Sequence, residues 1–251
     1  MPPLSPLIVI PARMAATRLP GKPLAEIHGT PMIVHVWRRA MAAEAGPVVV
    51  ACPDPEIVAA VEKAGGKAVL TLADHPSGSD RVFEAVTKLD PQRKHDVIVN
   101  VQGDLPTLDP AIVRAALAPL ADPVVDIATL ACPMREAWER ESSAAVKVAA
   151  GFTPDARRAR ALYFSRALIP WGDGPHYHHI GLYAFRRAAL ERFVALPPSP
   201  LEERERLEQL RALEAGMRID VALVDAAPLG VDTPADLERA RGLLDPARKK
   251  T

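Results

Sequence analysis

A chain of 251 residues is long enough for one α/β domain with a sizeable core. Its 31 Lys and Arg residues balance its 31 Asp and Glu residues, and this net charge of zero argues against a nucleic acid or a membrane surface bound through bulk charge. Cys52 and Cys132 lie in apolar runs without a CxxC motif, and the apolar run at 7–10 is too short for a signal peptide or membrane span, so we expect a cytoplasmic protein without a disulfide or zinc site.

The first half of the sequence alternates predicted strands with predicted helices. The apolar run at 7–10 is typical of a strand buried on both faces of a parallel sheet. The further predicted strands are 48–51, 67–70 and 96–101. The predicted helices are 30–43, with Thr30 as N-cap and Pro31 first, then 55–64, a helix from the polar loop 73–79 to about 89, and 110–120. This alternation predicts a Rossmann-like, mostly parallel central sheet with helices on both faces.

The pattern changes after about residue 124, where strands follow one another. The predicted strands are 124–132, 144–150, 160–164 and 178–185, so we expect a strand-rich insert at about 124–186 within a single domain, and a mixed sheet. Ser199 and Glu202 form a capping-box pattern that predicts a helix to about 215. A further strand is predicted at 218–224, and Thr233 begins the last helix.

A loop with three cations follows the first predicted strand. Arg13, Arg18 and Lys22 lie in this loop without an acid, and Leu19–Lys22 predicts a tight turn in which Gly21 takes a positive φ. Open α/β sheets bind ligands at the carboxyl ends of their strands. The loop therefore predicts a site for a polyanion such as a nucleoside triphosphate, although a solvated surface loop is the alternative. Neither a dinucleotide fingerprint nor a P-loop is present.

Two acids follow predicted strands elsewhere in the chain. Asp104 comes after the strand at 96–101, and Asp232 comes after the strand at 218–224. If both strands belong to one parallel sheet, the two carboxylates converge at its carboxyl edge. Mg²⁺ is usually held by one or two carboxylates together with substrate phosphates and waters. With the basic loop, the pair predicts an Mg²⁺ site, whereas each acid alone also fits a helix cap or a turn.

Motifs along nearly the whole chain resemble those of the 3-deoxy-manno-octulosonate (Kdo) cytidylyltransferases. The opening stretch IPARMAATRLPGKPL carries the resemblance first. The further matches are PMIVHVW at 31–37, ADHPSGSDR at 73–81, VNVQGD at 99–104, LYFSRALIPW at 162–171, HIGLYAFR at 179–186, SPLEERERLEQLRALEAG at 199–216 and GVDTPADLERAR at 230–241. Their order and spacing make the resemblance specific to this family.

The resemblance implies a Rossmann-like nucleotidyltransferase fold and the reaction of CTP with Kdo to give CMP-Kdo and pyrophosphate, for lipopolysaccharide synthesis. It implies an Mg²⁺-dependent homodimer whose insert serves dimerisation or sugar binding. The implied catalytic residues are Arg13 and Lys22, on the triphosphate, and Asp104 and Asp232, as metal ligands, while Arg18 is expected to have a structural salt bridge. The implied CTP-binding residues also include Ser77, Gly78, Arg81 and Gln102, of which Gln102 has loop support as its alternative role. The implied sugar-binding residues are Arg166, His179, Tyr183, Glu208 and Gln209.

Two positions depart from the family's usual motifs. Leu105 stands where the family has Glu in QGDEP, and Ala144 stands where it has Asn in Asn-Ala-Val-Lys. At Leu105 we expect either a raised Mg²⁺ requirement, because an acid near the metal is lost, or a side chain that packs under the loop. The departures leave open a cytidylyltransferase for a related acid, such as an amino-Kdo or a sialic-acid-like sugar, or a non-catalytic nucleotide-sugar binding homologue. The retained basic loop and acid pair favour the enzyme.

Overall fold

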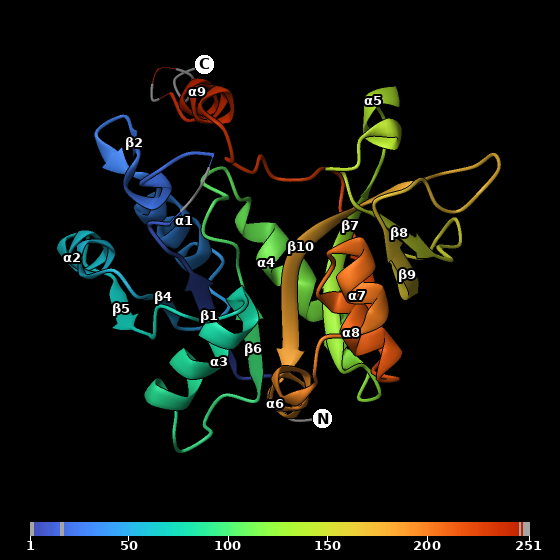
Figure 1. Ribbon diagram of the computed structural model, residues 1–251, viewed down its shortest axis with the longest axis horizontal. Coiled ribbons are helices and arrows are strands. Elements are labelled where there is room, and N and C mark those ends of the chain that lie inside the picture. The colour runs from blue at the N-terminus through green and yellow to red at the C-terminus, as the bar shows by residue number, and fades with distance from the viewer. Residues whose placement is uncertain (1–2, 16–17, 246, 248–251) are drawn as a thin grey trace. The chain divides into compact units, whose positions relative to one another are not determined.

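The structure is a computed structural model that describes residues 3–15, 18–245 and 247 (Figure 1). The chain divides into two compact units: unit 1 contains residues 1–113 and 228–251, and unit 2 contains residues 114–227. Unit 2 is thus one continuous stretch, which begins before and ends after the insert expected at 124–186, and its first boundary falls inside helix α4 (Pro110–Leu117). Among the described residues, no helix is long and apolar enough to cross a membrane.

Unit 1 contains a sheet whose strands run in the order β5-β4-β1-β6. Each neighbouring pair is parallel, with Ile8 opposite Val48 and Leu7 opposite Ile98. The apolar runs of β1, β4 and β6 are buried, as their sequences predict. The strands are β1 (Pro6–Pro11), β4 (Val48–Cys52), β5 (Lys67–Leu70) and β6 (Val97–Asn100), and the helices that pack on them are α1 (Met32–Met41), α2 (Pro55–Lys63) and α3 (Gly78–Leu89). The alternation of helices and strands predicted for this part is confirmed.

The start of α1 differs from the prediction. Thr30 and Pro31 do not open the helix but form a short strand, β3 (Thr30–Pro31), which pairs with β2 (Glu26–Ile27). The helix therefore begins at Met32, with Pro31 as its N-cap. Pro31 disfavours the helical conformation for the residue before it, and Thr30 is accordingly extended. This hairpin places the buried side chain of Ile27 beside the start of α1.

Unit 2 contains strands in the order β10-β7-β11-β9-β8. β11 runs parallel to β7, and the other pairs are antiparallel. Because β8 also pairs with β10, through Lys147 opposite His178, the pairings close into a ring. The strands are β7 (Ile127–Pro133), β8 (Lys147–Ala150), β9 (Arg158–Ser165), β10 (Tyr177–Arg186) and β11 (Ile219–Leu223). The predicted return of the chain from β8 to β9 is confirmed.

The helix predicted from 200 to about 215 is two helices. α7 (Pro200–Glu205) ends at Arg206, whose φ of 56° lies in the left-handed region, and α8 (Gln209–Glu214) follows. The capping-box pattern correctly predicts the start of α7. Residues 202–206 are all Glu or Arg, which are good helix formers, so the sequence does not reveal the break. The sequence did not predict α5 (Ala137–Glu141) and α6 (Arg187–Ala195), whereas the short η2 (Ala118–Ala121) lies at the end of the helix predicted at 110–120.

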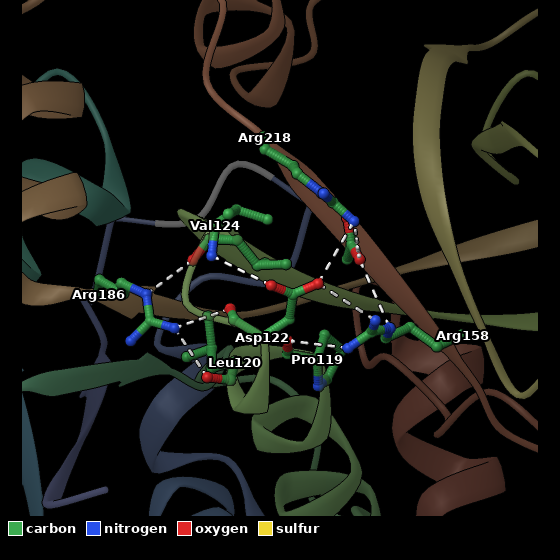
Figure 2. Close-up of polar contacts among 9 residues, drawn as sticks. Pro119, Leu120, Asp122, Val124, Arg158, Arg186 and Arg218 are labelled. Carbon is green, nitrogen blue, oxygen red and sulfur yellow. Dashed lines mark hydrogen bonds and ion pairs between the residues drawn. The ribbon is translucent and has the colours of Figure 1, made fainter. Parts of the chain in front are cut away.

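Charged side chains tie the segment after η2 to the strands of unit 2 (Figure 2). Arg186, at the end of β10, donates hydrogen bonds to three backbone carbonyls of residues 120–125, at 2.8 to 2.9 Å. The carboxylate of Asp122 lies 3.4 Å from the guanidinium of Arg158 and 3.8 Å from that of Arg218. Arg186 thus gives these backbone carbonyls a charged donor, which anchors this turn.

Candidate functional site

The basic loop begins where β1 ends and is fixed at both ends. The backbone amide of Ala12 donates to the carbonyl of Ala51, and the amide of Met14 donates to the carboxylate of Asp54 at 2.8 Å. At the far end, the amide of Lys22 donates to the carbonyl of Leu19, and Gly21 has a φ of 69°. The predicted tight turn is confirmed, and it leads into η1 (Lys22–Leu24). Residues 16–17 of the loop lie outside the described residues.

The loop after β6 lies directly against the end of β1. A Cβ atom on Gly103 would come within 2.6 Å of the backbone oxygen of Pro11. A side chain at this position therefore cannot be accommodated without moving backbone. Gly103 allows its neighbours Gln102 and Asp104 to approach the basic loop, because the chain passes so close to β1.

The acid pair predicted from the sequence meets at one ammonium group. Lys22 Nζ lies 2.8 Å from Asp104 Oδ2 and 3.1 Å from Asp232 Oδ1. Burial lowers the pKa of Lys22, but the two carboxylates outweigh burial and raise that pKa above its ordinary value. Arg18 forms an ion pair of 3.1 Å with Asp232, so the salt bridge expected for Arg18 is confirmed. The convergence predicted for Asp104 and Asp232 is confirmed too.

Asp232 reaches the site by a route that the sequence did not predict. Asp232 does not lie at the end of a strand of unit 1. Instead, the backbone amide of Val231 donates to the carbonyl of Asp104 at 2.9 Å, and this hydrogen bond joins the segment of Asp232 to the loop after β6. Val231 is fully buried in a cluster with Ile27 and Met32. On the other side, Thr233 caps α9 (Pro234–Leu243). Asp232 is therefore held between a buried anchor and a capped helix.

A cavity of about 410 Å³ opens beside these residues in unit 1. Its lining includes every predicted metal-binding and CTP-binding residue. These are Arg13, Lys22, Ser77, Gly78, Arg81, Gln102, Asp104 and Asp232. Arg13 is exposed and makes no hydrogen bond or ion pair with any other residue the structure describes. Its charge is thus available to an anionic ligand in the cavity.

Ser77 and Arg81 have partners within the protein. Ser77 is the N-cap of α3, and its hydroxyl accepts hydrogen bonds from the amides of Ser79 and Asp80. Arg81 is buried, and its guanidinium donates to the hydroxyl of Thr71 at 2.6 Å and to two carbonyls of residues 72–73. Burial lowers the pKa of Arg81, and the nearby charge of Arg13 lowers it further. Arg81 therefore fixes the loop before α3 as well as lining the cavity.

His75 lines the same cavity and was not among the residues predicted for the site. Its Nε2 atom is hydrogen-bonded to Glu84 of α3. Burial raises the pKa of Glu84, but hydrogen bonds from Lys88, His75 and the amide of Leu72 lower it to about 2. The carboxylate is thus charged and orients the imidazole. The signal was present in the sequence, because His75 lies inside the matched stretch ADHPSGSDR.

Two of the predicted sugar-binding residues, His179 and Tyr183, lie together on β10 in unit 2. Their rings are 5.6 Å apart. The hydroxyl of Thr129 donates toward the carbonyls of Ile180 and Leu182, so it accepts a hydrogen bond of 3.0 Å from Nε2 of His179. Burial lowers the pKa of His179 to about 3 and raises the pKa of Tyr183, so both side chains are neutral at pH 7.

The other three predicted sugar-binding residues lie near the break between α7 and α8. Arg166 donates hydrogen bonds from its guanidinium to the backbone carbonyls of Ser143, Glu205 and Arg206. Glu208 and Gln209 stand at the start of α8. The buried amide nitrogen of Gln209 has no hydrogen-bond partner within the described ranges. A buried donor without a partner is costly, so this atom favours a polar ligand or water in unit 2.

The donor set of unit 1 fits Mg²⁺ bound with phosphates. Within the described part of the chain, no three His, Cys, Asp or Glu residues gather into a ready metal site. Asp104 and Asp232, however, share one cation in Lys22, so two carboxylates already converge. Mg²⁺ commonly takes one or two carboxylates and completes its shell with phosphates and waters. The pair fits that mode rather than a cage made only of protein ligands.

Comparison with known proteins agrees with this geometry. The cytidylyltransferase family model matches residues 7–219. The 3-deoxy-manno-octulosonate cytidylyltransferase of Paramagnetospirillum magneticum is 67% identical, over 96% of this chain and 98% of the relative, and that of Rhodospirillum centenum is 66% identical, over 97% and 95%. A solved CMP:2-keto-3-deoxy-manno-octonic acid synthetase complexed with CTP is 41% identical, with a TM-score of 0.89, over 98% of this chain and 99% of that chain.

A cytidylyltransferase from Leptospira borgpetersenii has the same fold at 17% identity, with a TM-score of 0.62. The chain therefore belongs to the cytidylyltransferase family and, within it, to the 3-deoxy-manno-octulosonate cytidylyltransferases, as its motifs predict. The mixed α/β architecture described above agrees with this membership.

Proposed function

We infer that this chain transfers CMP from CTP to the anomeric hydroxyl of Kdo, giving CMP-Kdo and pyrophosphate for lipopolysaccharide synthesis. One observation in the structure carries the proposal beyond family membership: a single cavity of unit 1 brings together Arg13, Lys22, Asp104 and Asp232. Cations for a triphosphate and carboxylates for a divalent ion are the groups that nucleotidyl transfer requires, since its catalysis rests on positioning and on neutralising charge.

In the proposed reaction, the anomeric oxygen forms a bond to the α-phosphorus of CTP, and the bond from that phosphorus to the bridging oxygen of pyrophosphate breaks. Arg13, which has no partner among the described residues, binds the triphosphate as a planar fork of donors. Lys22 lies at the same cavity and stabilises the negative charge that develops on the departing pyrophosphate. The hydroxyl proton leaves to solvent.

Asp104 and Asp232 would hold Mg²⁺ in this proposal. When bound, the ion supplies charge neutralisation at the phosphates and lowers the pKa of the attacking hydroxyl. The residues of the chain support this role through their own geometry, because Lys22 and Arg18 already balance the two carboxylates. The ammonium of Lys22, which lies beside both carboxylates, would then be available to the phosphates.

Kdo carries a carboxylate and several hydroxyls, and unit 2 offers groups suited to both. Two N–H groups of the Arg166 guanidinium remain after its three bonds to carbonyls, since a guanidinium has five donors. We propose that these bind the sugar carboxylate. His179, Tyr183, Glu208 and Gln209 would contact the hydroxyls, which the buried, unpaired amide of Gln209 supports.

The assay that tests this function measures pyrophosphate release with each of the four nucleoside triphosphates against a panel of sugar acids. The panel contains Kdo, an amino-Kdo and a sialic acid. We expect release with CTP and Kdo, and at least about tenfold less with each alternative. Release of pyrophosphate with an amino-Kdo or a sialic acid but not with Kdo would assign that sugar acid as the substrate instead. No release with any pair of nucleotide and sugar acid would contradict the proposal.

Two further properties belong to the proposal. We propose a homodimer formed through unit 2, which is supported by its exposed large apolar side chains Trp138, Leu162 and Trp171. Light scattering coupled to size-exclusion chromatography tests it, and a monomer at micromolar concentration contradicts it.

We also propose a cytoplasmic location, supported by Cys52 and Cys132, which are both free and buried.

A further inference from the structure

Lys147, the first residue of β8, is fully buried. Its exposed fraction is 0%, and no carboxylate lies within ion-pair distance of it among the residues the structure describes. Burial lowers the pKa of Lys147, because it disfavours the charged form of the ammonium. A lysine in such a place is costly unless its donors are used. The partners of its ammonium therefore show what the side chain does.

Both partners are backbone carbonyls, and they belong to different segments. Lys147 Nζ donates to the carbonyl of Ser142 at 2.5 Å and to the carbonyl of Arg166 at 3.1 Å. Lys147 itself lies on β8 at the bridge to His178, where the ring of strands in unit 2 closes. The ammonium thus joins the loop before β8 to the end of β9 from a position that is fixed on two sides.

Arg166 continues this set of contacts to a third segment. Its guanidinium donates to Ser143 of the loop before β8 and to Glu205 and Arg206 at the end of α7. The carboxylate of Glu205 returns a contact, since it accepts from the amide of Arg166 at 2.9 Å. Three segments therefore meet at Arg166, and Lys147 holds two of them in place.

We propose that Lys147 is a positioning residue of the sugar-acid subsite, which sets the orientation of the Arg166 guanidinium by fixing the backbone on which Arg166 and its partner Ser143 stand. This inference rests on the proposed function, in which Arg166 binds the sugar carboxylate. Without the ammonium, the carbonyls of Ser142 and Arg166 lose their donor and the two segments can separate. A displacement of about 1 Å in a binding group can cost roughly 100-fold in rate.

The test compares Lys147→Met with Arg186→Met in the full chain. Arg186 is a matched control, because it also lies in unit 2 and also donates to backbone carbonyls, but those of residues 120–125 (Figure 2). We measure pyrophosphate release while Kdo is varied at saturating CTP, and then the reverse, with a thermal melt of each protein. Lys147→Met should raise the KM for Kdo about tenfold or more, with little change in the KM for CTP. Arg186→Met should lower the Tm and leave the KM for Kdo unchanged.

Two further variants show whether Lys147 acts through Arg166. In the double variant of Lys147→Met with Arg166→Lys, the increase in the KM for Kdo should be less than the product of the two single increases, because both changes remove one interaction. Lys147→Gln keeps a hydrogen-bond donor on a shorter side chain, so its KM for Kdo should lie between those of the wild type and Lys147→Met. This variant replaces Lys147→Met in the test if Lys147→Met does not fold.

Several outcomes would overturn the inference. One is an unchanged KM for Kdo in either folded variant of Lys147, and another is a rise in the KM for CTP equal to the rise in the KM for Kdo. A third is a KM for Kdo in the double variant that rises by the product of the two single increases. The fourth is failure of both Lys147 variants to fold. The last result would assign Lys147 to stability alone. Wild-type protein that releases no pyrophosphate with Kdo would instead contradict the proposed function itself, so the two failures are distinguishable.

Discussion

The ammonium group of Lys22 lies 2.8 Å from the carboxylate of Asp104, which is 82 residues later in the chain. The same atom is 3.1 Å from Asp232, which is 210 residues away. One cation therefore balances two carboxylates that come from distant parts of the sequence. A change at any of the three residues alters the charge that the other two experience, and the first two predictions follow from this coupling.

Replacing either acid should remove activity without unfolding the protein. Asp104→Asn and Asp232→Asn should each lower kcat by at least about 100-fold, because a proposed metal ligand is lost, and EDTA should have the same effect. The Tm should change little, since Lys22 keeps one carboxylate in each variant. Steady-state kinetics and a thermal melt measure this. Asp225→Asn, at an exposed acid of unit 2, is the control. Wild-type turnover in EDTA or in either variant would contradict the two-carboxylate site.

The two predicted phosphate ligands should respond differently to substitution. Lys22→Ala should lower kcat more than it raises the KM for CTP, because in the proposed reaction the contact of Lys22 strengthens as pyrophosphate leaves. Arg13→Lys should also lower kcat/KM, since an ammonium cannot replace a planar fork of donors. Arg38→Lys, on the exposed face of α1, should leave both constants unchanged. If kcat stays at the wild-type value in both loop variants, the loop is only a solvated surface.

The buried imidazole of His179 should make the free energy of unfolding depend on pH. Burial lowers the pKa of His179 to about 3, whereas an unfolded histidine titrates at about 6.5. Between these values the unfolded chain binds a proton that the folded chain does not. This site therefore contributes its full stability above pH ~6.5 and loses it as the pH falls, by at most about 1.4 kcal/mol for each pH unit.

His179→Gln tests this contribution, because glutamine can still donate to Thr129 but does not titrate. The free energy of unfolding, measured with urea, should fall between about pH 7.5 and about pH 4.5. It should fall less for the variant than for the wild type. Parallel curves for the His179 variant and the wild type would show that another group controls acid unfolding.

Leu105 is 8% exposed, and its Cδ2 atom would be 3.9 Å from a Cβ placed on Gly230. This burial supports the second of the two expectations for Leu105, in which the side chain packs under the loop. Leu105→Glu should lower the Tm, because a carboxylate would be buried, and should not lower the Mg²⁺ concentration for half-maximal rate. Leu105→Met, which keeps the volume, should cost less than about 1.5 kcal/mol. A stable Leu105→Glu variant with a lower Mg²⁺ requirement would restore the first expectation.

Much of the site could be predicted because local sequence and strand order determine it. The apolar run of β1, the turn at Gly21 and the acid after β6 are local signals, and each is where the sequence places it. The approach of Asp232 to Asp104 was predicted for a reason that is only partly right. A backbone bond from Val231 to Asp104 brings them together, and backbone pairing of irregular segments leaves no pattern in the side chains.

Two errors in the predicted fold, at Thr30–Pro31 and at Arg206, also have a physical cause in tertiary contacts. Thr30 and Pro31 are residue types that often begin a helix. In this chain they pair with Glu26 and Ile27 as a strand instead. The break at Arg206 is hidden because arginine is a good helix former, and it adopts a left-handed φ only where its carbonyl and that of Glu205 meet Arg166. Tertiary partners from elsewhere in the chain override local propensity in both cases.

The division of the chain into units also constrains how the protein is made. Unit 1 is assembled from both ends of the described sequence, whereas unit 2 is one uninterrupted segment between them. Because synthesis runs from the N-terminus, all of unit 2 is made before Asp232 and α9, and the buried cluster of Ile27, Met32 and Val231 can be completed only afterwards. The cavity of unit 1, which we propose to bind CTP, can therefore form only late in translation. A ribosome that stalls before residue 228 leaves a chain that has every residue of unit 2 but lacks Val231 and Asp232 of the proposed nucleotide site.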